Sequence, residues 1–405
     1  MSGVPTAGLV IAGSLLLTFV LVRLGRARAA TTDGEGVRFG GFNALRALAA
    51  IGVVAGHSLA TSSPVPELPR FVVQNMATGV ALFFVISGFL LYRPFAASLE
   101  QPGKVSIRRF AANRGLRILP LYVLVVLVVY LASPAAYSPL ELVRGLTFTG
   151  VYAGQDLVPV AWSLDDEVAF YLLLPVLFLA LVAWPRPGQR LRLGAGAIGA
   201  LCVLSLVALA VSPQDQSIIG GPITKFHQFG LGMLLATLHV SRPRFLPGPR
   251  VLLGAGAAIL VLLIVSGIAF EAHSYFFSPV CGLAHFLLVG LVAFSASGSR
   301  LTRALSWGPM VFLGDISYGV YLWHEPVHHV LFNLGVLSAG YVVGFLELVC
   351  CTVALATGTY FVVEKPALSV KRDWAATSRP RGVPMATPVA GQPDGMRLAQ
   401  RAPDR

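Results

Sequence analysis

The chain has 405 residues, of which 56% are hydrophobic and only 12% are charged. A soluble domain carries about twice that charged fraction, so the composition excludes an ordinary soluble protein and indicates an integral membrane protein. The net charge is +12, but the basic residues recur in short loops between apolar runs. That distribution is typical of membrane orientation signals and argues against nucleic acid as a partner.

Eleven apolar runs are long enough for membrane-spanning helices, each of which needs about 20 residues. The runs are roughly 6–22, 42–61, 72–95, 117–133, 160–184, 194–212, 223–240, 250–270, 276–297, 309–331 and 338–363. They predict an all-α fold, a polytopic transmembrane helix bundle of ten core helices plus one extra N-terminal helix. We expect residues 1–36 to form that helix and a basic loop, 37–370 the membrane domain, and 371–405 a disordered cytoplasmic tail.

The loops between these runs alternate in charge. Those at 23–38, 93–117, 186–192, 241–250, 300–303 and 365–380 are basic, whereas those near 62–70, 134–158, 213–222, 271–275 and 332–337 are poor in Lys and Arg. The positive-inside rule places the basic loops in the cytoplasm. The chain is therefore predicted to be a multi-pass protein of the plasma membrane, with its N-terminus outside and its tail inside.

Two basic residues bracket the apolar stretch 47–56. Arg46 and His57 are eleven residues apart, so on a helix they lie within about 20° of one face and about 16 Å from each other. The structural alternative for Arg46 is a snorkelling arginine at the membrane interface. The alternative for His57 is a histidine that is hydrogen-bonded within the bundle. Ionisable groups inside a membrane are, however, functional candidates by default.

A second basic cluster lies in the segment 108–117. Arg114 and Arg117 are three residues apart and are neighbours on one helix face, and Arg108 and Arg109 precede them. Arginine forks suit phosphate oxygens, so the cluster predicts an anion site for a donor such as coenzyme A. The alternative is membrane anchoring alone. Pro120 is expected in the first turn of the helix.

Two more segments place polar residues next to apolar runs. Ser163 and Asp166 form a capping-box pattern, which leaves Glu167 unexplained. A carboxylate at Glu167 could orient a histidine or bind a hydroxyl. Ser87 and Gly88 lie within an apolar run and, lacking the GxSxG pattern, indicate a close helix–helix contact.

The segment 313–329 carries several polar residues in one helix. Pro326 is expected to kink that helix. His324 and His328 are four apart, as metal ligands can be, but no HExxH motif accompanies them. The four cysteines (Cys202, Cys281, Cys350 and Cys351) lie in apolar runs with no metal-binding spacing. We therefore predict no metal site.

Taken in order, these motifs resemble those of the acyltransferase-3 family of membrane O-acyltransferases. The resemblance covers roughly 37–370 and rests on the R-x10-H pair, FFVISGFL at 83–90, R-x-x-R-x-x-P at 114–120, WSL-x-x-E at 162–167, ISYGVYLWHEP at 316–326 and EKP at 364–366. Two departures stand out: Asn43 and Ala44 replace the family's frequent Asp-Gly, and the helix at 6–22 is extra.

The resemblance implies acyl transfer from acyl-CoA to a hydroxyl of a sugar, glycan or macrolide-type natural product. It associates activity with Arg46, His57, Arg114 and Arg117, and Glu167 matches the family's carboxylate. Acyl-CoA would be a co-substrate, with no permanently bound cofactor. Because we see no appended hydrolase-like domain, we expect a small glycosylated or macrolide-type acceptor.

The mechanism expected from these residues begins with phosphate binding at Arg114 and Arg117. Arg46 would bind a phosphate or polarise the thioester. His57 would either take the hydroxyl proton as a general base or carry the acyl group transiently. The rival functions are a transporter for a glycosylated or acidic solute and a structural membrane scaffold.

Overall fold

The structure is a computed structural model of the whole chain. It describes residues 34–59, 67–101, 105–133, 135–150, 157–211, 220–241, 249–271, 277–295, 299–338 and 340–370, together with the single residues 13, 20, 23 and 152. The predicted N-terminal helix at 6–22 and the tail at 371–405 lie outside the described ranges.

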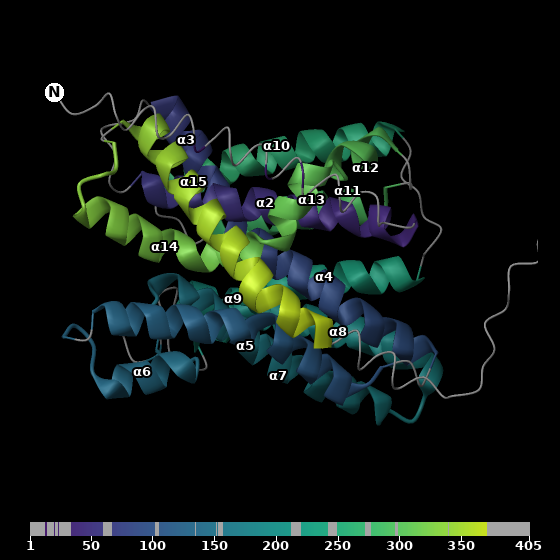
Figure 1. Ribbon diagram of the computed structural model, residues 1–405. Helices are drawn as coiled ribbons and strands as arrows, with labels where there is room; N and C mark the ends of the chain where they lie inside the picture. The colour runs from purple at the N-terminus through teal and green to yellow at the C-terminus, as the bar shows by residue number, and fades with distance from the viewer. Residues whose placement is uncertain are drawn as a thin grey trace, which may run out of the picture.

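The described part of the chain is a bundle of helices without a strand (Figure 1). The first helices are α2 (Gly34–Ser58), α3 (Glu67–Met76), α4 (Gly79–Glu100), α5 (Ile107–Ala132), α6 (Pro139–Leu146), η2 (Pro159–Ala161), α7 (Trp162–Val182) and η3 (Pro187–Gln189). They are followed by α8 (Arg190–Val211), α9 (Gly220–Ser241), α10 (Pro249–Glu271), α11 (Phe277–Ala293), α12 (Arg300–Leu305), α13 (Gly308–Asp315), α14 (Ser317–Asn333), α15 (Tyr341–Thr359) and η4 (Tyr360–Glu364). Where the structure describes them, the ten predicted core spans are mainly helical, but the span 72–95 is divided between α3 and α4 by a turn at 77–78.

Helices α4 and α9 pack against each other at the centre of the bundle, and glycines allow their close approach. A Cβ added at Gly88 would meet the backbone of Phe229, and one added at Gly232 would meet the backbone of Val85. Small residues at such crossings let helix backbones approach closely. The close contact predicted for Ser87-Gly88 is thus confirmed.

Helix α15 crosses the face of the bundle diagonally, from the end of α14 toward α5 (Figure 1). It packs on α14 and α2, and the π-helical turn η4 at its C-terminal end packs on α5. This crossing brings Glu364 from the C-terminal part of the chain to Arg117 of α5.

Two further local predictions are wrong. The segment 309–331 is two helices, because the chain breaks at Ile316, where Ser317 Oγ donates to the Gly314 carbonyl at 2.8 Å. Pro120 lies in the middle of α5 rather than in its first turn, since α5 begins at Ile107 behind the N-cap Ser106.

The outside of the bundle carries large apolar side chains that a soluble protein would bury. Leu131, Leu172 and Val211 are 70%, 70% and 77% exposed. Among the described residues, four helical segments are long and apolar enough to cross a membrane: Gly79–Glu100, Ile107–Ala132, Pro187–Val211 and Tyr341–Val370. Both observations agree with a multi-pass membrane protein.

We predict that Gly88→Ala lowers the free energy of unfolding by about 1–3 kcal/mol, because the added methyl group meets backbone that cannot rotate away. The control is Gly196→Ala in α8, where a Cβ meets nothing within 4 Å. Ala favours helix over Gly by about 1 kcal/mol, so the control should be neutral or stabilising. Thermal unfolding in detergent measures both variants, and equal effects would contradict the packing account.

Candidate active site

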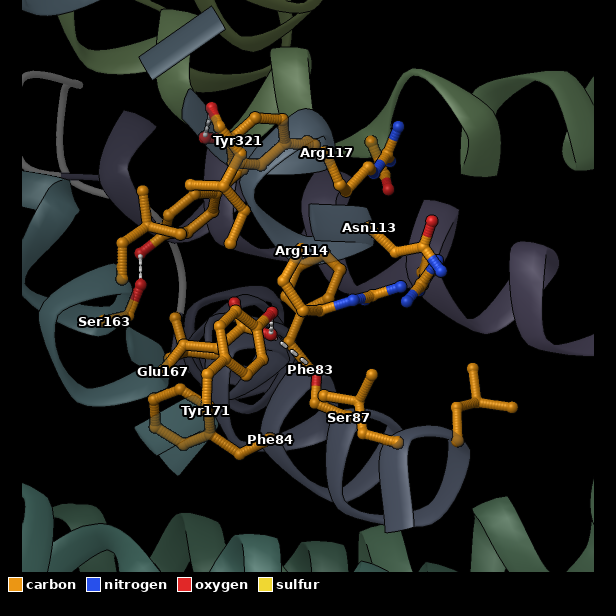
Figure 2. Close-up of a pocket in the computed structure, with 18 of the residues that line it drawn as sticks. Phe83, Phe84, Ser87, Asn113, Arg114, Arg117, Ser163, Glu167, Tyr171 and Tyr321 are labelled. Carbon is orange, nitrogen blue, oxygen red and sulfur yellow. Dashed lines mark hydrogen bonds between the residues drawn. The ribbon is translucent and has the colours of Figure 1, made fainter. Parts of the chain in front are cut away.

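A cavity of about 450 Å³ lies inside the bundle among α2, α4, α5, α7 and α14 (Figure 2). Its walls combine apolar and aromatic side chains with a few polar and charged groups. The lining residues are Arg46, Val80, Phe83, Phe84, Ser87, Leu90, Leu91, Asn113, Arg114, Arg117, Ile118, Ser163, Leu164, Glu167, Tyr171, Ser317, Tyr318, Tyr321 and Leu368. Largely apolar cavities with a few convergent polar groups are typical of small-molecule sites.

Glu167 is the carboxylate of this cavity. The hydroxyl groups of Ser87 and Tyr171 both donate to Oε1 of Glu167, at 2.8 and 2.6 Å. Ser87 belongs to α4, and Tyr171 follows Glu167 by one turn of α7. Since both described bonds fall on one oxygen, Oε2 remains available to a ligand. The sequence predicted a role for Glu167 but not that the hydroxyl groups of Tyr171 and Ser87 would hold it.

The three arginines of the cavity differ in how they are held. Nη1 of Arg117 forms an ion pair with Oε2 of Glu364 at 3.1 Å, and Nη2 donates to the Asp315 carbonyl at 3.3 Å. The Glu364 side chain is 2% exposed. Within the described ranges, neither Arg46 nor Arg114 forms an ion pair. Arg117 is thus fixed by the protein, whereas Arg46 and Arg114 can accept a ligand.

Arg108 and Arg109 lie apart from this cavity. Both are exposed in the first turn of α5, where the Arg109 backbone N–H donates to the N-cap Ser106 at 3.3 Å. Arg114 lies about 8–9 Å further along the same helix. The structure therefore divides the predicted basic cluster into an outer pair and an inner pair.

Asn43 occupies a position at which the family that the sequence resembles often has an aspartate. In this structure, Asn43 is hydrogen-bonded to an aspartate of another helix. Its Nδ2 donates to Oδ1 of Asp315 at 3.0 Å. The Asp315 carbonyl in turn accepts from Arg117. Helix α13 thus supplies a carboxylate next to α2, and Arg46, one turn after Asn43, faces the cavity.

His57 lies in the last turn of α2 and does not line the cavity. It is exposed, and its Nδ1 lies 2.9 Å from Nε2 of His324, which is 0% exposed. Arg46 and His57 lie on one helix, as predicted, but of the two only Arg46 lines the cavity. In the sequence, His324 stands out by its spacing from His328, and no local pattern connects it with His57.

Tyr321 lies between the cavity and this histidine pair. It lines the cavity, its ring centroid is 6.0 Å from that of Phe83 and 5.8 Å from that of His324, and it precedes His324 by one turn. Its hydroxyl donates to the Val160 carbonyl at 2.7 Å. Ser163 Oγ lies 2.8 Å from the same hydroxyl (Figure 2).

The capping box predicted at Ser163 and Asp166 is wrong. Helix α7 begins at Trp162 behind Ala161, with no side-chain cap, so Ser163 is already in the first turn. Its hydroxyl bonds with Tyr321 across the bundle instead of capping its own helix.

A family model described as an acyltransferase domain matches residues 39–362. That range includes Arg46, Arg114, Glu167 and the His57–His324 pair. The chain belongs to this acyltransferase family.

Curated relatives are similar over much of the chain. Peptidoglycan O-acetyltransferase OatA of Listeria monocytogenes is 26% identical over 310 residues, 70% of this chain and 48% of the relative. Nodulation protein 10 of Rhizobium leguminosarum bv. viciae is 27% identical over 375 residues, 83% of this chain and 95% of the relative. Exopolysaccharide production protein ExoZ of Rhizobium meliloti is 28% identical over 319 residues, 72% and 89% of the two chains.

The chain spans about half the length of OatA and most of the two rhizobial proteins. No solved structure matches it.

We predict that Glu364→Gln destabilises this acyltransferase, because it leaves the Arg117 charge without its partner inside the bundle. Breaking a fully buried ion pair costs about 3–5 kcal/mol. We expect less here, because the Arg117 side chain is 21% exposed. The test is thermal unfolding of Glu364→Gln, of Arg117→Gln and of the double variant. The double variant should lose less stability than the sum of the two single variants, and strict additivity would contradict the pairing.

Proposed function

We propose that this chain is a membrane O-acyltransferase that moves an acyl group, most simply acetyl, from acyl-CoA to a hydroxyl of a sugar, glycan or glycosylated natural product. The observation that carries the proposal is the cavity in which Arg46 and Arg114, without ion-pair partners in the described ranges, face the held carboxylate of Glu167. Ionised groups inside a membrane bundle are costly unless they serve function or pair with one another.

The cavity walls suit the acyl arm of the donor better than the whole molecule. A volume of about 450 Å³ lies within the range of sites for small ligands, and Phe83, Phe84 and Leu90 provide apolar surface for an acyl chain and its thioester. Arg114 and Arg46 would meet phosphate oxygens at its mouth. The nucleotide would then lie outside the cavity, toward the exposed Arg108 and Arg109.

We propose that the donor enters near the segment 93–117. The positive-inside rule assigns that basic segment to the cytoplasm, where acyl-CoA is made. The orientation of the chain, with its N-terminus outside and its tail in the cytoplasm, is part of the proposal.

His57, which lies beyond Tyr321 from this cavity, would act as the general base of the transfer, so the thioester would react at the Tyr321 end of the cavity. The acceptor oxygen attacks the thioester carbon, its proton moves to His57, the carbon–sulfur bond breaks, and the imidazolium returns the proton to the leaving thiolate. The products are an ester and free coenzyme A. A second route, in which His57 carries the acyl group before the acceptor attacks, uses the same atoms in two steps.

The names of the relatives support a carbohydrate acceptor. One is a peptidoglycan O-acetyltransferase and another serves exopolysaccharide production. We propose a sugar hydroxyl, and within that class a small glycosylated or macrolide-type acceptor. Mass spectrometry of glycans and metabolites from a deletion strain would identify which molecule loses its acyl group.

We predict that His57→Ala abolishes acyl transfer by the purified protein in lipid nanodiscs while donor binding remains. The measurement follows the transfer of a radiolabelled acetyl group from acetyl-CoA to a panel of sugar acceptors. Wild-type turnover would support the enzyme over a transporter. Full activity in His57→Ala would contradict the role of the histidine but not the acyltransferase class.

We predict that Arg114→Gln raises the KM for acetyl-CoA about 10-fold or more, because a charge-assisted contact contributes about 1.5–3 kcal/mol. The matched donor is acetyl-pantetheine, which has the thioester arm but no phosphate. Its KM should be the same in wild type and variant. An equal increase for both donors would show that Arg114 does not bind phosphate.

A further inference from the structure

The hydrogen bonds of the histidine pair at the end of α2, His57 and His324, bear on which ring nitrogens carry a proton. Nε2 of His324 lies 2.9 Å from Nδ1 of His57, and Nδ1 of His324 is hydrogen-bonded to the Tyr321 backbone carbonyl. His324 is 0% exposed, whereas His57 is exposed. Both nitrogens of the inner ring are therefore occupied, whereas the outer ring contacts His324 and the Val53 backbone one turn earlier in α2.

The protons of this chain of bonds can be assigned from the acceptor at its inner end. A carbonyl oxygen can only accept, so Nδ1 of His324 must carry a proton. A neutral imidazole carries one proton, so Nε2 of His324 is an acceptor. The 2.9 Å contact then requires Nδ1 of His57 to donate. A neutral His57 consequently has its lone pair on Nε2.

The alternative assignment needs a doubly protonated His324. Its described hydrogen bonds go to a carbonyl oxygen and to another imidazole, neither of which is an anion. A cation with such partners at a fully buried position would cost several kcal/mol. The neutral state of His324, and with it the Nδ1–H tautomer of His57, is therefore favoured.

We propose that His324 is a positioning residue that holds His57 in the Nδ1–H tautomer, so that Nε2 is the nitrogen that reacts. The proposal rests on the function proposed above only in so far as His57 takes part in transfer. In this proposal, the neutral imidazole of His324 orients His57, as a carboxylate orients the histidine in many other active sites. Glu167 does not orient His57 here, because its described hydrogen bonds go to Ser87 and Tyr171.

The assignment has a consequence for both routes of transfer. In the base route, the acceptor proton moves to Nε2 of His57 while Nδ1–H stays bonded to His324. In the carrier route, the acyl group is bonded to Nε2, and the same Nδ1–H bond orients the ring. Neither route moves a proton onto the buried His324, so the inner ring stays neutral throughout.

The first test measures the tautomer without any substrate. Nitrogen NMR of protein labelled with ¹⁵N-histidine, with His57→Gln to assign the signal, reports which ring nitrogen carries the proton. We expect His57 to be protonated at Nδ1 and unprotonated at Nε2 in wild type. A wild-type His57 protonated at Nε2 would overturn the proposal, whatever the protein catalyses.

The second test separates positioning from packing. In His324→Gln, the side-chain carbonyl can take the place of Nε2 and accept from His57, whereas His324→Phe fills similar space without an acceptor. We expect Phe to lower kcat about 10-fold or more with an unchanged KM for acetyl-CoA, as for removal of outer-shell partners of other functional histidines, and Gln to retain most of the turnover.

The control is Tyr321→Phe, which keeps the carbonyl that binds His324 and removes only the hydroxyl group. Its NMR spectrum should show the wild-type tautomer of His57. Equal losses of kcat in His324→Gln and His324→Phe, with equal thermal stability, would show that the ring of His324 only fills space. Absence of acyl transfer in wild type would refute the proposed function and leave the tautomer measurement standing.

Discussion

The cost of charge inside an apolar bundle governs the arrangement of this protein. Its bundle holds several ionised groups where lipid surrounds the helices, and each is tolerated only with a partner or a purpose. Arg117 has Glu364 as its partner. Glu167 accepts from Ser87 and Tyr171. Arg46 and Arg114 are different, since no ion pair within the described ranges binds them, and both face the same cavity. The unpaired cations are the best guide to where an anionic substrate goes.

The close packing of the central helices holds α4, which forms one wall of that cavity. Gly88 and Gly232 bring α4 and α9 together at the backbone. Ser87, the neighbour of Gly88, is thereby held on α4 where it reaches Glu167 of α7. Because interiors packed at this density do not deform gradually, the carboxylate oxygen is held in one place before any ligand arrives. The ring of Tyr321 lines the cavity on the side toward the His57–His324 pair.

Much of the fold follows from the sequence, because a membrane helix is a local pattern. Apolar length alone located the core helical segments, although not the breaks at 77–78 and at Ile316, and the spacing of Arg46 and His57 placed both on one helix. The local patterns failed where a contact from another helix competes. The sequence pattern predicts that Ser163 caps a helix, yet its hydroxyl group is hydrogen-bonded to that of Tyr321, which is 158 residues away.

The different roles of the residues within the site could not be predicted from the sequence either. Arg114 and Arg117 look equivalent in a three-residue spacing, but Glu364 pairs with Arg117 from 247 residues away. His57 likewise meets His324 across 267 residues. Such pairings depend on how α14 and α15 cross the bundle, and periodicity says nothing about that crossing.

The most direct test of the central claim, that the cavity binds the acyl donor, is photocrosslinking with an acyl-CoA whose acyl chain carries a diazirine. Peptide mass spectrometry of the purified protein would locate the labelled residues. The account predicts labels on the apolar wall formed by Phe83, Phe84 and Leu90, and their loss when acetyl-CoA competes. Labels confined to the outer surface of the bundle, or labels on that wall that acetyl-CoA does not reduce, would contradict it.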